Sequence, residues 1–234
     1  MDKNSNKYIF IYASVMVILV AAVLSIANIS LKSAQQKNIK IEKKQNILAS
    51  VNIESTTENA DQLFNTKVVK SYILNSKGEI VKGDAFNIDM KKEKQEKDLE
   101  KRSLPVYEFS IDGETKYVFP MYGAGLWGPI WGYISLDSDL NTIYGATFDH
   151  ASETPGLGAE IATKKFQKQF QGKKIFDDQE NFVSITVAKA NETASEQHSV
   201  DAISGGTLTS KGLQNMLLND LGAYRAFFKQ KKSE

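Results

Sequence analysis

The segment Asp201-Ala-Ile-Ser-Gly-Gly-Thr-Leu-Thr-Ser210 brings two adjacent glycines and several hydroxyl side chains together. Gly205 and Gly206 have no side chains, so a phosphate group could come close to the backbone amides around them. An ordinary loop that caps a helix would use the same residue types, because one hydroxyl can bind a backbone amide of the first turn. The candidate nucleophiles or esterification sites of this segment are Ser204, Thr207, Thr209 and Ser210.

A helical pattern follows this segment directly. Its apolar residues recur every three to four positions, which predicts one buried helix face. The first amides of a helix have no intrahelical acceptor, and the helix dipole favours negative charge there. The hydroxyl groups are therefore expected at an anion-binding helix N-terminus. The apolar positions of this helix are Leu213, Leu217, Leu221, Tyr224 and Phe228.

Two more glycine-rich segments precede it, Tyr122-Gly-Ala-Gly-Leu-Trp127 (followed by Gly132-Tyr133) and Glu153-Thr-Pro-Gly-Leu-Gly158. Together with Asp201-x-x-Ser-Gly-Gly-Thr207, and in this order, they resemble the motifs of the FMN-binding domain family that includes the C subunit of sodium-translocating NADH:quinone reductases. The resemblance extends over nearly the whole chain. Gly206 stands where alanine is common in the motif, and since both residues are small, the role of Thr207 is unaffected.

The resemblance implies that a flavin transferase esterifies the phosphate of FMN onto Thr207. Asp201 would orient the motif or help to activate the threonine. Thr154 and nearby backbone groups would meet the flavin edge, Leu157 would pack on the ring, and Trp127 would stack on it or cover it. The remaining cofactor-binding residues implied by the resemblance are Leu126, Glu153, Gly158, Ser204, Gly205, Gly206 and Thr209.

The implied function is electron transfer by covalently bound FMN, in a membrane complex that couples NADH oxidation and quinone reduction to sodium export. We expect no dinucleotide fingerprint of the Gly-x-Gly-x-x-Gly type, so that the NADH site would lie on a partner subunit. Two alternatives remain open. One is the G subunit of the related ferredoxin-linked membrane redox complex, and the other is a membrane-anchored binding module without redox activity.

The run from Tyr8 to Leu31 contains no charged residue and is bracketed by Lys7 and Lys32. About 20 helical residues cross the hydrocarbon core of a bilayer, so this run predicts a single uncleaved membrane anchor. Two arguments about its orientation disagree. More lysines follow the run than precede it, which favours a cytoplasmic domain, whereas the family resemblance implies a periplasmic domain on the bacterial inner membrane. We adopt the periplasmic orientation, because long domains translocate despite such charges.

Composition excludes several other classes of protein. The net charge of +1 provides no basic field for nucleic acid. The chain has no cysteine, which excludes disulfides and thiolate-bound iron–sulfur clusters. With only His150 and His198, a metal site is not expected. A triad built on His150 is rejected as well, since no Gly-x-Ser-x-Gly elbow is present.

We divide the chain into a tail (1–7), a transmembrane helix (8–31), a membrane-proximal helix with a linker (32–66) and an FMN-binding domain (67–234). Strands without a regular β-α alternation, followed by helices, predict an α+β domain with a mainly antiparallel sheet and flanking helices. The expected strands are 68–74, 80–81, 106–109, 116–119, 133–136, 142–148 and 182–188. Asp112-Gly113 is expected to form a hairpin turn. The expected loop and helices are a glycine-rich loop at 123–132, a helix at 159–170 and the last helix.

Overall fold

A computed structural model describes residues 5–96, 98–189 and 195–233. The chain forms two compact units, Met1–Lys43 and Lys44–Glu234. The first unit consists of α1, a helix that spans Asn6–Ser50 and therefore extends into the second unit. By length and composition α1 is able to cross a membrane, and the uncharged run from Tyr8 to Leu31 lies within it.

The second unit is built on a six-stranded antiparallel sheet with the order β2-β1-β3-β4-β5-β6. Asp-Gly pairs favour tight turns, and one such pair joins β3 to β4. Asp112 and Gly113 both have positive φ, 51° and 83°, in the turn between β3 and β4. The strands are β1 (Val68–Leu74), β2 (Ile80–Val81), β3 (Leu104–Ile111), β4 (Glu114–Ala124), β5 (Pro129–Leu136) and β6 (Ile143–His150).

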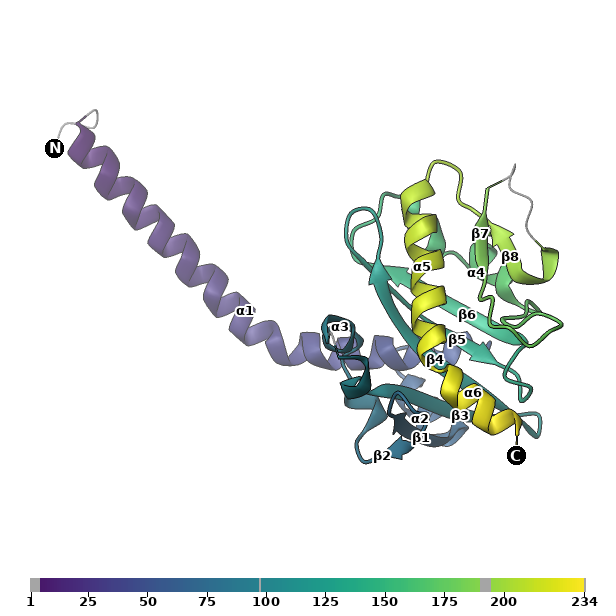
Figure 1. Cartoon of the computed structure of the whole chain (residues 1–234). Coiled ribbons are helices and arrows are strands. Elements are labelled where there is room, and N and C mark those ends of the chain that lie inside the picture. Colours follow the sequence, from purple (N-terminus) through teal and green to yellow (C-terminus); the bar gives the residue numbers. More distant parts are fainter. Residues whose placement is uncertain (1–4, 97, 190–194, 234) are drawn as a thin grey trace. The chain divides into compact units, whose positions relative to one another are not determined.

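Two C-terminal helices, α5 (Thr207–Ala223) and α6 (Arg225–Lys232), cover one face of this sheet (Figure 1). Phe119 of β4 packs edge-on against Tyr224 and Phe228, with ring centroids 4.8 and 5.1 Å apart. The sequence pattern predicts one helix through Phe228, but the structure divides it at Tyr224. The buried Tyr224 hydroxyl donates a hydrogen bond to the carbonyl of Pro105 at 2.9 Å, which fixes the position of this break.

The other face of the sheet is covered by the residues from Lys44 to Val51 and by α2 (Ala60–Lys67). Ile47, Leu48 and Val51 are at most 1% exposed. The ring of Phe64 in α2 packs edge-on against Tyr107 of β3 at 5.9 Å. The compact unit of the structure begins at Lys44, and the residues between Lys44 and the expected boundary at residue 67 cover the second face of the sheet.

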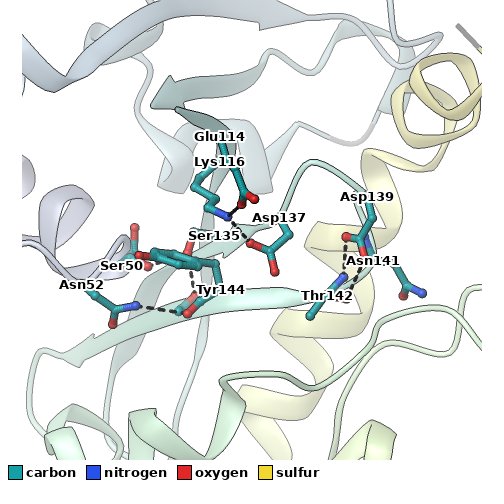
Figure 2. Close-up of polar contacts among 11 residues, drawn as sticks. Ser50, Asn52, Glu114, Lys116, Ser135, Asp137, Asp139, Asn141, Thr142 and Tyr144 are labelled. Atoms are coloured by element: carbon teal, nitrogen blue, oxygen red, sulfur yellow. Dashed lines mark hydrogen bonds and ion pairs between the residues drawn. The ribbon is translucent and has the colours of Figure 1, made fainter. Parts of the chain in front are cut away.

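Hydrogen bonds fix the end of α1 to β5 and β6 (Figure 2). Ser135 Oγ donates to the carbonyl of Ser50 at 2.5 Å, and Asn52 Nδ2 donates to the carbonyl of Tyr144 at 3.2 Å. Asn52 has a φ of 58°, a left-handed conformation that asparagine tolerates after a helix. The end of α1 is thus held by the sheet itself.

Beside these bonds, the buried Lys116 binds two carboxylates (Figure 2). Its Nζ lies 2.6 Å from Glu114 Oε2 and 2.6 Å from Asp137 Oδ1, and 4.6 Å from the centre of the Tyr144 ring. Burial lowers the pKa of Lys116, but the two carboxylates outweigh that effect and raise it above its ordinary value. The two ion pairs compensate the buried charge of Lys116, so a role in the fold accounts for this cluster.

The remaining elements are short. The expected helix at 159–170 is divided into η3 (Gly158–Ala162), α4 (Lys164–Gln167) and η4 (Lys168–Phe170), because the Thr163 hydroxyl caps α4. The expected strand at 182–188 is reduced to β7 (Thr186–Ala188), which pairs in parallel with β8 (Ser199–Asp201). The other short helices are η1 (Ala85–Asn87), α3 (Met90–Gln95), η2 (Leu99–Lys101) and η5 (Glu196–His198).

Candidate functional site

Thr207 is the first residue of α5, and its side chain is exposed. The residue before the helix is Gly206, which has no side chain to cap it. The amide of Ser210 donates to the Gly206 carbonyl at 2.9 Å and begins the helical hydrogen bonding. The amides of Thr207, Leu208 and Thr209 have no acceptor among the described residues. An anion placed here would accept these hydrogen bonds and would benefit from the helix dipole.

The structure divides the four hydroxyl groups of the segment into two pairs. Thr209 is buried, and its Oγ1 donates to Glu153 Oε2 at 2.6 Å. Ser210 is buried too, and its Oγ accepts from the amide of Ile203 at 3.1 Å. Ser204 and Thr207 are exposed, and neither hydroxyl has a hydrogen bond within the part of the chain that the structure describes. Of the four hydroxyl groups, only those of Ser204 and Thr207 are exposed to solvent.

The turn before α5 requires its glycines. Gly205 has a φ of 74°, and a Cβ there would lie 2.6 Å from Leu157 Cδ2. Gly206 is buried, and a Cβ there would lie 2.9 Å from Ile203 Cγ2 and 3.4 Å from the amide nitrogen of Gly158. The loop that contains Leu157 therefore packs directly on the loop that leads to Thr207.

Glu153 joins the first glycine-rich segment to α5. Glu153 is 5% exposed, and its carboxylate accepts hydrogen bonds from the amide of Trp127 at 2.8 Å and from Thr209 Oγ1 at 2.6 Å. Burial raises the pKa of Glu153, but these bonds, with others from the Leu126 and Gly128 amides, outweigh it and hold the pKa below its ordinary value. The three segments predicted to form the site thus meet at one ionised carboxylate.

The first segment is a tight hairpin between β4 and β5, closed by a 2.8 Å hydrogen bond from the Gly125 amide to the Gly128 carbonyl. The loop covers only 125–128, because β4 and β5 pair as far as Ala124 and Pro129, inside the range 123–132 expected to be loop. Leu126 and Trp127 at its tip are 48% and 67% exposed.

Exposed apolar side chains thus converge near Thr207 from all three segments. Besides the hairpin tip, Leu157 is 41% exposed and Leu208 of α5 is 58% exposed. Large apolar side chains so exposed, on loops whose backbones are fixed, form a surface suited to a flat apolar ring. The exposed hydroxyl of Thr154 has no hydrogen bond among the described residues, so it is free to bind a polar ring edge.

The hairpin contains the literal spacing Gly-x-Gly-x-x-Gly, in Gly123-Ala-Gly-Leu-Trp-Gly128, contrary to our expectation that this spacing is missing. A dinucleotide fingerprint must lie between a strand and the N-terminus of a helix, where the pyrophosphate binds. Here the segment joins two antiparallel strands. The spacing is therefore coincidental, and it provides no NADH site.

Asp201 ends β8, and its side chain is exposed, while its amide donates to Gln169 Oε1 at 2.9 Å. His150 has a structural role: its Nδ1 accepts a hydrogen bond from the amide of Glu153 at 3.2 Å. Among residues 5–96, 98–189 and 195–233, no group of three or more histidine, aspartate or glutamate side chains is arranged to hold a metal.

One set of positioning residues on α5 was not predicted from the sequence. A Cβ on Gly123 would lie 2.8 Å from Met216 Cβ, and Asp220 Oδ2 accepts from the Tyr122 amide at 2.8 Å. Gly212 lies against the carbonyl of Ala124. Residues 212, 216 and 220 are four positions apart on α5 and contact the end of β4. Each comes one position before an apolar residue of the predicted buried face, at 213, 217 and 221. The four-residue spacing of a glycine, a methionine and an aspartate was the available signal.

The chain matches a family model of the FMN-binding domain over residues 125–221. It is 31% identical to the C subunit of the Na(+)-translocating NADH-quinone reductase of Haemophilus ducreyi, in an alignment of 228 positions covering 88% of each chain. It is also similar to a crystal structure of the same subunit from Parabacteroides distasonis, with 45% identity and a TM-score of 0.79, covering 85% of this chain and 96% of that one.

The chain belongs to the family of C subunits of Na(+)-translocating NADH-quinone reductases. A further member of this family, from Yersinia pestis, is 29% identical and covers 86% of this chain and 83% of its own length. The match to the FMN-binding domain begins at Gly125, in the β4–β5 hairpin, and ends within α5. It therefore contains the hairpin tip, the Glu153–Gly158 segment and Thr207, which belong to the three segments that meet at Glu153.

Proposed function

We propose that this chain is the flavin-carrying electron-transfer subunit of a membrane complex that couples NADH oxidation and quinone reduction to sodium export. Membership in the family of C subunits and the FMN-binding domain support this function. The observation that carries it is the meeting of three segments at Glu153, beside an exposed Thr207 whose helix begins with unpaired amides. A flavin phosphate and a flavin ring each find suitable partners there.

The proposed link is a phosphate ester between FMN and Thr207 Oγ1, formed by a flavin transferase. The unpaired amides at the start of α5 would bind the remaining phosphate oxygens. Asp201 lies outside the helix, with an exposed carboxylate that a transferase could bind. The ester fixes the cofactor without touching the isoalloxazine ring, so the neighbouring protein groups determine its redox properties.

For the ring, we assign Leu126, Trp127 and Leu157 as apolar contacts and the Thr154 hydroxyl as a polar one. Their exposed positions on fixed loops support the assignment. Ser204, Gly205, Gly206 and Gly158 would shape the backbone around the phosphate. Thr209 and Glu153 have a different part, since their polar atoms bind each other.

Other subunits of the complex are the partners of this chain, as for the family. We assign the NADH site to one of them, since the glycine spacing of this chain lies in a hairpin. The anchor α1 would hold the chain in the membrane, and its length and composition support this role. We further propose that the compact unit from Lys44 onward faces the periplasm.

The ester is tested on the full chain produced together with a flavin transferase. The tryptic peptide that ends at Lys211 contains all four hydroxyl groups, so fragmentation spectra are needed to locate the adduct. We expect flavin on Thr207, fluorescence that survives a denaturing gel, and loss of both in Thr207→Ala. Ser204→Ala is the matched control, because Ser204 is the other exposed hydroxyl, and it should keep its flavin. An adduct on Ser204 or Thr209 would overturn the assignment.

A further inference from the structure

We propose that Glu153 is a positioning residue: its carboxylate holds the hairpin tip and the start of α5 in the arrangement that receives the flavin, and it does not bind the flavin itself. The proposal rests on the proposed function, which supplies the ligand. It changes the role that the motif alone suggests for Glu153, which is direct contact with the cofactor.

Both carboxylate oxygens are already used within the protein. Oε1 accepts from the Trp127 amide at 2.8 Å, and Oε2 accepts from Thr209 Oγ1 at 2.6 Å. Two glycines close over the group. A Cβ on Gly125 would lie 3.0 Å from Glu153 Cδ, and one on Gly158 would lie 2.5 Å from Thr209 Oγ1. At 5% exposure, Glu153 offers little surface to a ligand.

The turn that contains Ser152 and Glu153 binds both polar backbone groups of Trp127. Ser152 Oγ donates to the Trp127 carbonyl at 3.0 Å, while Glu153 accepts from the Trp127 amide. The amide of Glu153 is in turn bound by His150 Nδ1 at 3.2 Å, at the end of β6. The backbone of Trp127 is therefore fixed at both polar groups, although its side chain is exposed. A fixed backbone under an exposed ring reduces the entropy lost when a flat ligand packs on it.

The carboxylate also brings a negative charge close to the segments assigned to the flavin. Because hydrogen bonds hold the pKa of Glu153 below its ordinary value, the group is ionised at neutral pH. Reduction adds electron density to the flavin ring, and a nearby buried anion disfavours this. The geometry therefore predicts that the charge of Glu153 lowers the midpoint potential of the flavin.

The test uses three variants of the full chain in detergent, each with and without flavin. Glu153→Gln keeps the shape and loses the charge, since its amide oxygen can accept from Trp127 or from Thr209. Thr209→Val keeps the charge and removes one donor. Glu153→Ala removes the carboxylate entirely. Glu160→Gln, a change of the same type further along the chain, is the control.

Without flavin, we expect the Trp127 amide of Glu153→Ala to exchange its hydrogen about tenfold faster or more, as the loss of a charge-assisted hydrogen bond implies. With flavin, Glu153→Ala should remain modified at Thr207, with lower flavin fluorescence anisotropy and a spectrum closer to that of free FMN. Thr209→Val should change the anisotropy and the spectrum in the same direction as Glu153→Ala, but by a smaller amount. Glu153→Gln should keep the anisotropy and shift the midpoint potential upward.

Unchanged exchange, anisotropy and potential in Glu153→Ala would overturn the proposal. If Glu153→Ala does not fold, the other two variants decide. The proposal would be overturned if Glu153→Gln had the same flavin midpoint potential as the wild-type chain and Thr209→Val had unchanged flavin anisotropy. A comparable potential shift in Glu160→Gln would also do so, because the effect would then not be local. A chain that carries no flavin on Thr207 at all contradicts the proposed function, while the exchange measurement without flavin still decides the role of Glu153.

Discussion

Gly212 of α5 lies directly against the carbonyl oxygen of Ala124, at the end of β4, and leaves no room for a Cβ. The close approach allows α5 to run along the strand that ends in the hairpin tip. Thr207 begins the same helix. The distance between Thr207, the proposed attachment residue, and the hairpin is therefore set partly by the absence of a side chain at position 212.

Gly212→Ala should destabilise the protein. The added methyl group would overlap a backbone oxygen, and overpacking of this kind costs about 1–3 kcal/mol. The gain in helix propensity, about 1 kcal/mol, offsets this only in part. The measurement is the free energy of unfolding in denaturant.

The same helix offers a matched control for this change. In Gly222→Ala the new Cβ would meet Phe182 Cε1 at 3.4 Å, an ordinary contact. This variant should gain up to about 1 kcal/mol from helix propensity. Equal effects of the two substitutions would show that contact with Ala124 does not constrain α5.

The stability of the domain should fall at acidic pH partly through Glu153. The pKa of this carboxyl in the folded state lies below its ordinary value of 4.5, because the hydrogen bonds of its carboxylate outweigh its burial. The stabilisation is therefore complete above about pH 4.5 and is lost as the pH falls through the lower, folded-state value. In Glu153→Gln, the unfolding free energy should be smaller at neutral pH and should decline less below about pH 4.5.

Asp220 provides a control of opposite sign. Burial raises its pKa above the ordinary value of 3.8, despite the ion pair with Lys94 and the Tyr122 amide. The contribution that Asp220 makes is present below its unfolded pKa and is lost as the pH rises through the raised, folded-state value. Removing this group by Asp220→Asn should therefore make the acid-induced loss of stability steeper. If Glu153→Gln and Asp220→Asn changed the pH profile in the same direction, our assignment of the two shifts would fail.

Truncation should distinguish between two domain boundaries. A chain that starts at Lys44 keeps the buried Ile47, Leu48 and Val51 and should fold as a soluble domain. A chain that starts at Lys67 loses these three side chains, each worth about 1.5–3 kcal/mol of burial, and exposes the second face of the sheet. Circular dichroism and thermal unfolding should show a cooperative transition only for the longer chain. Equal cooperativity would place the boundary at residue 67 after all.

The orientation of the anchor can be tested by fusions at the C-terminus. A periplasmic domain should give an active alkaline phosphatase fusion and a dark green fluorescent protein fusion, since the latter does not become fluorescent when exported unfolded. The lysines that follow Leu31 predict the reverse. A bright fluorescent fusion together with an inactive phosphatase would establish a cytoplasmic domain.

Much of the sheet could be predicted because its signals are local. The strand 68–74 and the Asp112-Gly113 turn follow from β-prone runs and turn residues, and both occur where expected. The strands β4 and β5 are longer than predicted, because Gly123, Gly125 and Gly128 look like a long loop in sequence. In the structure, Gly123 faces Met216 within a paired strand. The residues next to Gly123 in the sequence give no sign of this tertiary contact.

In the site, too, features with local signals could be predicted and tertiary contacts could not. The glycines and hydroxyl groups of 201–210 predict the start of a helix, and α5 begins at Thr207 as expected. The partners of individual side chains could not be predicted, because Thr209 and Glu153 are far apart in sequence and their hydrogen bond depends on how α5 crosses the hairpin. For the same reason, residues 44–51 were expected in a membrane-proximal helix outside the domain, although the sheet buries the few apolar side chains among them.

The burial of Thr209 and Ser210 has a consequence for the order of events in biosynthesis. A nascent, unfolded chain presents every hydroxyl of the segment to a modifying enzyme, whereas the folded chain withholds two of them and presents Thr207 at the head of a formed helix. If Thr207 carries the flavin as proposed, the fold of the chain itself contributes to the choice of hydroxyl group. Labelling that follows folding is confined to the exposed pair, while labelling during synthesis would depend on the enzyme alone to reject the neighbouring residues.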